Sequence, residues 1–234
     1  DIAAALEVDP NWVDALYDAL KDQYPHWVKV PKDNSYGVVM MSKMEPSETQ
    51  VRDLLVDDVP SIRTKVAMPS GRMWRLYIVH PEPPVPYHDT KGRDGEIALV
   101  GIEASKDDLP AIVTGDLNDV AWSTTTRRFQ RLSGLLDPRV GRGFYNTFHA
   151  GIAVMRWPLD HLFHDAEFRL IRMSRLPSIG SDHFPILFSL ALTGEPQSNS
   201  TPEQSDAEER AEVREMAAEE REKDREAIGT DWEK

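Results

Sequence analysis

The sequence contains no cysteine and no long hydrophobic run. Without cysteine, its 234 residues can form neither a disulfide framework nor a thiolate metal site, and a cysteine nucleophile is excluded. No window approaches the roughly 18 consecutive apolar residues of a membrane span, and the first ten residues lack the basic start and apolar run of a signal peptide. The chain shown is therefore expected to be soluble, and its localisation is left unknown.

The sequence is also poor in positive charge. Lysine and arginine together number 27 against 40 acidic residues, which gives a net charge of −13. Residues 195–234 alone carry 14 acidic and 6 basic side chains. Phosphate neutralisation supplies most of the non-specific affinity of nucleic-acid-binding proteins. The charge balance therefore disfavours a long, tightly held duplex as a partner.

The composition that remains is that of a globular protein with an appendage. Hydrophobic residues make up 40% of the chain, enough for a buried core. The pattern divides the chain into a domain over 1–192, a polar linker over 193–204 and a charged tail over 205–234 that is helical or disordered. Ser205 and Glu208 have capping-box spacing, and the few small apolar residues that follow favour a solvated helix.

Within residues 1–192, short β-rich runs alternate with amphipathic stretches, which predicts an α/β or α+β layered domain. The expected strands are Tyr36–Ser42, Ser61–Met68, Trp74–His80, Ala111–Gly115, Leu159–Phe163, Phe168–Met173 and Ile186–Leu192. Two helices are expected, Asn11–Gln23 and Ser123–Leu132.

Polar residues follow several of the expected strands, where a rigid scaffold can hold a site. Asp116 and Asn118 come after a buried apolar run and Gly115, and alternation along an extended chain points both side chains the same way. A carboxylate and an amide would then share one wall of a pocket. Ordinary turn chemistry after a glycine is the other interpretation of this segment.

Three further segments carry histidines. Asp182 and His183 precede the last strand, Asp160 and His161 lie within an apolar strand, and His80 ends a strand before a proline-rich loop. A carboxylate beside an imidazole fixes its tautomer and favours its protonated form. Singly, each segment is equally typical of a surface turn or a satisfied buried pair.

Taken in order, these segments resemble the endonuclease/exonuclease/phosphatase superfamily of metal-dependent phosphoesterases, which includes exonuclease III-like and deoxyribonuclease-like enzymes. The resemblance covers about residues 5–192. It rests on Leu6-Glu7-Val8-Asp9, Asn34-Ser35-Tyr36-Gly37 through Ser42, Val79-His80-Pro81, Gly115-Asp116-Leu117-Asn118, Leu159-Asp160-His161 and Ser181-Asp182-His183.

The resemblance implies a two-sheet β-sandwich flanked by helices and a Mg²⁺-dependent hydrolysis, with Mn²⁺ as an alternative ion. The resemblance implies that the carboxylates of Glu7 and Asp182, but not that of Asp9, belong to the metal site. The other predicted site residues would take part in catalysis. Asp116 would orient or deprotonate the attacking water, Asn118 and His80 would hold the phosphate, and His183, charged by Asp160, would stabilise the transition state.

The family also uses an asparagine on a strand upstream of its glutamate, whereas only six residues precede Glu7. The resemblance therefore implies a chain that lacks the first strand, together with any membrane anchor that the full-length protein carries upstream of it.

The substrate class is left open, between nucleic acid and a small phosphorylated molecule, and no obligate protein partner is expected. A nuclease would need a basic groove, for which Arg127, Arg128, Arg131, Arg139 and Arg142 are the local candidates, with a solvated helix face as the alternative. A second hypothesis for the function is an inactive scaffold or phosphate-binding protein that retains the fold.

Overall fold

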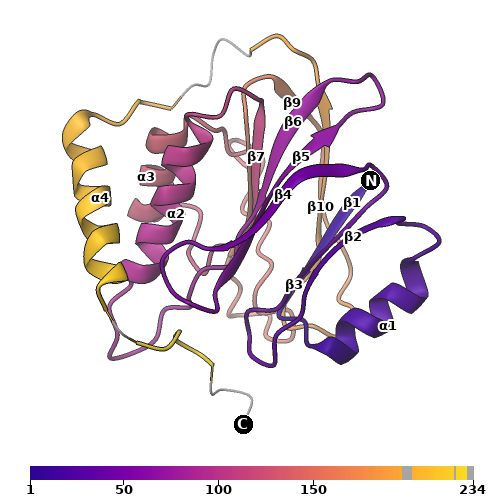
Figure 1. The fold of residues 1–234 in the computed structure, drawn as a ribbon, viewed down its shortest axis with the longest axis horizontal. Helices are drawn as coiled ribbons and strands as arrows, with labels where there is room; N and C mark the ends of the chain where they lie inside the picture. The colour runs from indigo at the N-terminus through magenta and orange to yellow at the C-terminus, as the bar shows by residue number, and fades with distance from the viewer. Residues whose placement is uncertain (197–201, 224, 231–234) are drawn as a thin grey trace.

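The computed structural model describes residues 1–196, 202–223 and 225–230. These residues form ten strands and four helices (Figure 1). The strands are β1 (Ile2–Leu6), β2 (His26–Val30), β3 (Val38–Ser42), β4 (Pro46–Asp53), β5 (Pro60–Ala67), β6 (Met73–Ile78), β7 (Ala111–Asp116), β8 (Asp160–His164), β9 (Phe168–Arg175) and β10 (Ile186–Leu192). The helices are α1 (Pro10–Leu20), α2 (Lys91–Ala104), α3 (Thr124–Ser133) and α4 (Ala207–Arg221).

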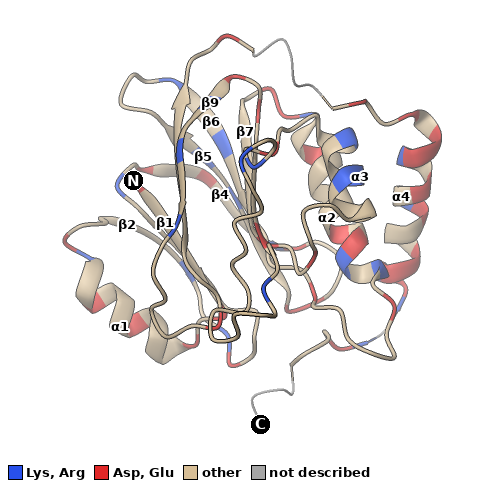
Figure 2. Ribbon diagram, turned by 180° about the vertical axis from the view of Figure 1, so that it is seen from behind, with Lys and Arg blue, Asp and Glu red and all other residues tan. Residues whose placement is uncertain are grey.

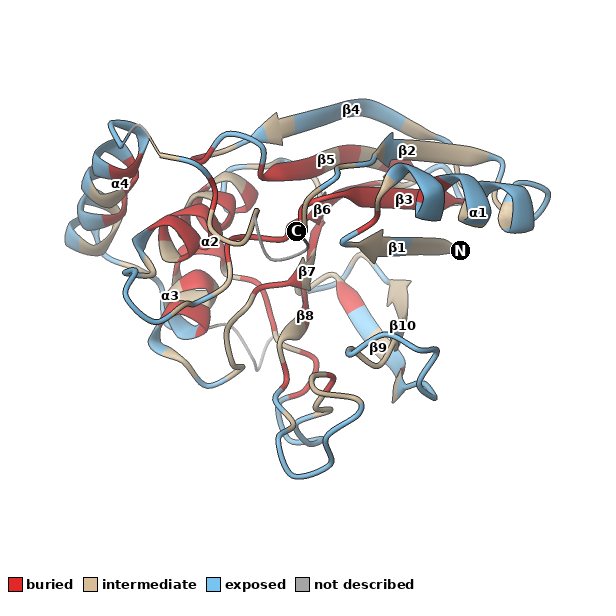
Figure 3. Ribbon diagram, turned by 90° about the horizontal axis from the view of Figure 1, so that it is seen from below, coloured by how far each residue is buried: buried red, intermediate tan, exposed pale blue. Residues whose placement is uncertain are grey.

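A five-stranded sheet in the order β4-β5-β6-β7-β8 forms the centre of the molecule. Only β6 and β7 run parallel, and α2 makes the crossover between them. One face of the sheet packs on α2 and α3, as Figure 3 shows from below. In that interface, Tyr77, Val113 and Phe163 of the sheet meet Ile97 of α2 and Phe129 of α3. Tyr77, Val113 and Phe163 are register partners across β6, β7 and β8, so their side chains lie on the same face of the sheet.

The opposite face of the sheet packs on a second β layer. This layer consists of two separate ladders, β1-β3-β2 and the hairpin β9-β10. Both contribute to one core, in which Ile62 and Trp74 of the central sheet meet Met40 of β3 and Phe168 of β9. The sequence prediction of an α/β fold with packed β layers flanked by helices is confirmed.

The sequence predicted β3 and β5 to β10 within two residues at each end, but it missed β1, β2, β4 and α2 as elements. Helix α2 contains Gly92, Gly95 and Gly101, and glycine disfavours helix formation. Close packing explains these glycines, because a Cβ at Gly92 would lie 2.3 Å from Glu82 Oε2 and one at Gly95 would lie 2.8 Å from Leu55 Cδ1.

The expectation of a solvated tail helix is wrong for α4. Val213 and Ala217 are buried at 0% and 1% exposure, where they pack on α2 and on the segment after β4. The predicted cap is also displaced by one residue, since the Asp206 side chain, not that of Ser205, accepts the helix-capping hydrogen bond from Glu209 N. Residues 197–201 of the predicted linker and residues 224 and 231–234 of the tail lie outside the described residues.

Acidic residues line the outer helix α4, and basic residues of α3 lie across from it (Figure 2). Over the described ranges, no helix has both the length and the apolar content that crossing a bilayer requires.

Candidate active site

Two glycines permit close backbone contacts directly beside Asp116 and Glu7. Gly115, with a φ of +146°, precedes the last residue of β7 and lies against the chain that leaves β6, and a Cβ there would lie 1.8 Å from the Val79 carbonyl oxygen. Gly37, before β3, makes a similar approach to the turn after β1, where a Cβ would lie 1.8 Å from the Val8 carbonyl oxygen. Gly115 therefore brings the carboxyl ends of β6 and β7 together, and Gly37 brings the start of β3 against the residues that follow Glu7.

Three of the predicted residues form a contiguous cluster. His183 Nδ1 lies 2.7 Å from Asp160 Oδ2, and His183 Nε2 lies 3.5 Å from Asp116 Oδ2. Asp116 ends β7 and Asp160 begins β8, where the two residues are direct partners across the ladder. His183 reaches them from the loop before β10, and its ring packs on Phe148 at a centroid distance of 5.0 Å. The imidazole thus lies between two carboxylates.

The cluster has unusual proton affinities. Burial raises the pKa of Asp116 to about 7, and the neighbouring Asp160 carboxylate adds to the shift. Burial alone would lower the pKa of His183, but the hydrogen bond and charge of Asp160 together with the charge of Asp116 raise it to about 9. At neutral pH the His183 ring is therefore a cation, and Asp116 is close to its midpoint, as suits a general base.

His80 follows β6 and lies beside Glu7. The His80 side chain is buried, with Nε2 3.7 Å from Glu7 Oε1, and its ring is 5.7 Å from that of Tyr36. Burial lowers the pKa of His80 to about 4, so this imidazole is neutral. Glu7 has a φ of 57° directly after β1, and its side chain is half exposed.

The other two predicted residues lie at the margin of this cluster. Asn118 donates from Nδ2 to the Pro81 carbonyl at 3.0 Å, and its own N–H donates to Asp116 Oδ1 at 2.8 Å. It therefore ties the loop after β7 to the loop that carries His80. Asp182 is exposed, and its backbone carbonyl accepts a hydrogen bond from Ala150 N. The charge of Asp182 contributes to the raised pKa of His183. Asp9 caps α1 by accepting from Trp12 N.

His161, the neighbour of Asp160 in sequence, points away from the cluster. It is buried, with Nδ1 2.5 Å from Arg139 Nη2 and Nε2 2.8 Å from the Asp119 carbonyl oxygen. Because burial and Arg139 both lower its pKa, His161 is a neutral structural residue. Asp160 pairs instead with His183 from the loop before β10.

Sequence reasoning missed three residues that connect to the site, namely the buried side chains of Tyr36 and Glu82 and the partly buried side chain of Arg225. Glu82 lies two residues after His80 and binds Arg225. A charged residue between prolines in the segment Pro81-Glu82-Pro83 was the available signal for it. Nothing in the sequence indicated its partner 143 residues away.

The oxygen-rich donor set suits a hard divalent cation. Over the described part of the chain, one group of acidic and imidazole side chains has the spacing for a metal ion, formed by ligand atoms of Asp116, Asp160 and His183 within 4.8 Å of one another. The raised pKa of His183 favours its cationic form over ligation, because a ligating imidazole must be neutral. Carboxylate oxygens at this end of the molecule, including those of the half-exposed Glu7, are therefore the donors that fit a cation.

The basic groove considered from the sequence is largely neutralised. Arg128 pairs with Glu209 and Glu212 of α4 at 3.3 and 2.9 Å, and Arg131 pairs with Glu209. Arg139 is buried against Asp137 at 2.9 Å. These guanidinium groups are not available to bind a phosphate backbone.

Comparisons with known proteins agree with the fold. The sequence profile of the endonuclease/exonuclease/phosphatase family matches residues 1–183. Among curated protein sequences, none matches. A structure of a mannosyl-6-phosphatase from Bacteroides thetaiotaomicron superposes with a TM-score of 0.66 at 19% identity, covering 82% of this chain and 85% of the other.

Two further structures show the same likeness. TDP2 from D. rerio, in complex with a single-stranded DNA product, has a TM-score of 0.67 at 16% identity and covers 82% of this chain and 86% of its own. The catalytic domain of human nocturnin, with a bound sulfate, has a TM-score of 0.60 at 16% identity and covers 81% of each chain. At these identities the likeness is one of fold.

Proposed function

Because the chain belongs to the endonuclease/exonuclease/phosphatase family, we propose that it hydrolyses a phosphoester with the help of Mg²⁺ or Mn²⁺. The observation that carries the proposal is the His183 imidazolium held between Asp116 and Asp160. A fixed cation next to a carboxylate with a pKa near 7 supplies both charge stabilisation and a base in one small space.

Each residue then has a distinct task. Asp116 orients the attacking water and accepts its proton, while His183 donates hydrogen bonds to the phosphate oxygens on which negative charge develops. Asp160 holds the His183 ring in place and keeps it protonated. His80, which is neutral and buried, faces the same phosphate, and Asn118 fixes the His80 loop against the loop of Asp116.

The cation would be held by Glu7, with Asp182 as a further carboxylate. When bound, it supplies a Lewis acid that polarises a phosphate oxygen. The residues of the chain provide the remaining functions by binding the phosphate, orienting the water and holding the proton.

Charge favours a small phosphorylated substrate over nucleic acid. Among the five arginines considered for a basic groove, Arg128, Arg131 and Arg139 are paired with acidic residues, and the chain has a net charge of −13. The solved neighbours include both classes, since one is named as a sugar phosphatase and another was solved with DNA.

The test is a substrate panel in Mg²⁺, in Mn²⁺ and in excess EDTA. The panel contains p-nitrophenyl phosphate, bis(p-nitrophenyl) phosphate, hexose phosphates and a single-stranded oligonucleotide. We expect turnover of a small phosphoester only with metal, and we expect Glu7→Ala to abolish it while the exposed Glu45→Ala on the same ladder region does not. Undiminished turnover in EDTA would refute the metal dependence. Binding of phosphate without turnover of any substrate would identify the chain as an inactive scaffold.

A further inference from the structure

A buried ion pair connects the His80 loop to the far end of the described chain. Arg225 donates from Nη1 and Nη2 to the two oxygens of Glu82, at 2.6 and 2.7 Å, and the Ile228 amide donates to Glu82 Oε1 at 2.8 Å. Glu82 is 2% exposed. A buried carboxylate that loses its partner is strongly disfavoured. The position of Glu82 therefore depends on residues 225–230, which we call the C-terminal segment.

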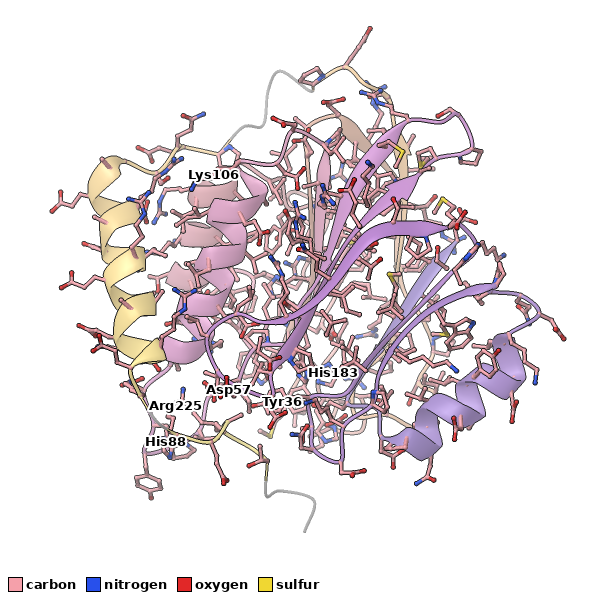
Figure 4. The ribbon with its side chains drawn as sticks, viewed as in Figure 1. Tyr36, Asp57, His88, Lys106, His183 and Arg225 are labelled. Atoms are coloured by element: carbon pink, nitrogen blue, oxygen red, sulfur yellow. The ribbon has the colours of Figure 1, made fainter. Side chains whose placement is uncertain are left out.

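The C-terminal segment also contacts the turn before β3, which lies against the backbone next to Glu7. The Ile228 carbonyl accepts a hydrogen bond from the Tyr36 hydroxyl. Tyr36 is 1% exposed, and the next residue, Gly37, accepts a hydrogen bond from Val8 N at 3.2 Å. Val8 directly follows Glu7. Figure 4 shows Tyr36, His183 and Arg225 toward the same lower end of the molecule.

The backbone of one residue thus joins two sides of the site. The Ile228 N–H reaches the loop of His80, and the Ile228 carbonyl reaches Tyr36 in the turn before β3, which lies against Val8 next to Glu7. We infer that the C-terminal segment is a positioning element for phosphoester hydrolysis, and that Arg225 acts through Glu82 to hold His80 at its working distance from Glu7. This inference rests on the proposed function.

The attachment of α4 does not require these contacts. Val213 and Ala217 already pack on the core, and Arg131 binds Glu209 at 2.5 Å on the opposite end of the helix. The C-terminal segment adds hydrogen bonds that end on the strand-end loops of the site. Misplacement of a site group by about 1 Å can reduce a rate by about 10²-fold. Loss of the Arg225–Glu82 pair should therefore reduce kcat more than it changes KM.

The experiment compares Arg225→Gln and Arg225→Lys with a matched control, Arg131→Gln, which breaks an ion pair of α4 with α3. A double variant, Glu82→Gln with Arg225→Gln, removes both charges and so leaves no unpaired buried carboxylate. Steady-state kinetics with the best small phosphoester and Mg²⁺ give kcat and KM, and thermal unfolding gives Tm.

We expect kcat of Arg225→Gln and of the double variant to fall roughly 10- to 100-fold with KM changed less than about threefold. Arg225→Lys should recover part of kcat, and Arg131→Gln should retain the wild-type kcat even where its Tm falls equally. Equal kcat for Arg225→Gln and Arg131→Gln would overturn the inference.

Amide hydrogen exchange provides a readout independent of turnover. In Arg225→Gln, exchange should accelerate at Ile228, whose amide donates to Glu82, and at Val8, whose amide donates to Gly37, and remain unchanged at β5 and at α1. Unchanged exchange at these two amides would overturn the positioning role. Wild-type protein that turns over no phosphoester would refute the proposed function itself, whereas normal wild-type turnover with no specific effect at Arg225 would refute the positioning role alone.

Discussion

At the scale of single residues, the two histidines next to the proposed phosphate position carry different charges. Both are largely buried, and burial disfavours the imidazolium. His183 has Asp160 at 2.7 Å and Asp116 at 3.5 Å, so its pKa rises to about 9. At His80 burial lowers the pKa to about 4, because the charges of Asp160 and His183 act on it in opposite directions and its neighbour Glu7, 3.7 Å away, is half exposed. The site therefore offers one fixed cation and one neutral imidazole.

The Asp160–His183 pair should act as a unit. Without Asp160, His183 is misplaced and less often protonated, so a second mutation has little left to remove. We expect Asp160→Ala and His183→Ala each to reduce kcat/KM by about 10²–10⁴-fold, and the double variant to resemble the worse single one. Kinetics of both singles and the double variant measure the coupling. Full additivity of the activation free energies would mean that the 2.7 Å contact has no catalytic role.

Glu96 gives a second residue-scale prediction, for stability. It is buried on α2, and its Oε1 has no hydrogen-bond partner among the described residues. Burial, with the nearby Glu82 charge, raises its pKa to about 8. The folded state therefore binds a proton that the unfolded state releases near pH 4.5. The stabilisation is complete below pH 4.5 and is lost as the pH rises through 8.

Glu96→Gln should abolish this pH dependence, because glutamine is neutral at every pH and has nearly the same shape. The free energy of unfolding of the variant minus that of wild type should therefore become larger between pH 5 and pH 9. Urea denaturation at pH 5, 7 and 9 measures the difference, and the exposed Glu215→Gln on α4 serves as a control that should follow wild type. Parallel pH curves for wild type and Glu96→Gln would contradict the assignment.

At the scale of elements, α4 shows how a few small side chains can fix a charged helix to a core. Val213, Ala217 and Glu220 are its buried residues, and Arg128 and Arg131 of α3 form ion pairs with its Glu209. Small residues permit close approach to α2. The exposed ion pairs add little to stability, so the buried contacts carry most of the attachment.

Ala217→Glu should therefore destabilise the protein, and Ala211→Glu should not. Both variants place a carboxylate on α4, but Ala217 is 1% exposed and Ala211 is exposed. Burying an unpaired charge typically costs several kcal/mol. For a chain of this size each kcal/mol lowers Tm by about 2–4 °C, so a fall of more than about 5 °C is expected. Equal Tm values for the two variants in thermal unfolding would show that α4 is not docked in solution.

The success of the sequence predictions differed between elements for physical reasons. Strands β7 and β10 were predicted because their apolar runs are continuous and end at glycine, proline or polar residues. Helix α2 was missed because its glycines, required by close packing, contradict helix propensity. The docking of α4 was missed because a sequence gives no sign of which alanines meet a partner surface.

The residues of the site also differed in whether the sequence could predict them. Asp116, Asp160 and His183 were predicted as site residues, and the structure brings them together. The pairing of Asp160 with His183 was implied by the family resemblance and agrees with the structure. The local sequence by itself does not distinguish this partner from the neighbouring His161, because that choice depends on the direction of side chains along β8 and on the loop before β10. Glu82 and Arg225 depend on a contact between distant segments, which no local pattern reveals.

At the scale of the whole molecule, charge should govern how the protein responds to salt. The net charge is −13, and Arg128, Arg131 and Arg139 are paired with acidic residues. A protein with 6–10 phosphate contacts loses about 10³–10⁵ in affinity between 50 and 200 mM salt. A small substrate bound at one phosphate should show far less dependence.

We therefore expect kcat/KM for a small phosphoester to change less than about tenfold between 50 and 200 mM NaCl at fixed Mg²⁺. Steady-state assays at constant pH measure it, with sodium acetate at matched ionic strength as a control for competition by chloride. Activity on a single-stranded oligonucleotide that exceeds activity on the small phosphoester and falls a thousandfold or more over the same salt range would indicate a polyanionic substrate, bound at many phosphates.

The distribution of the site residues along the chain also has a kinetic consequence. Glu7, Asp116 and His183 come from widely separated parts of the sequence, and Tyr36 contacts Ile228 across 192 residues. Contacts between residues so far apart in the sequence require large loops to close, and loop closure costs entropy before the contact is made. The α2–α3 face of the central sheet uses nearer segments and can form first. Refolding should therefore restore helical circular dichroism before catalytic turnover.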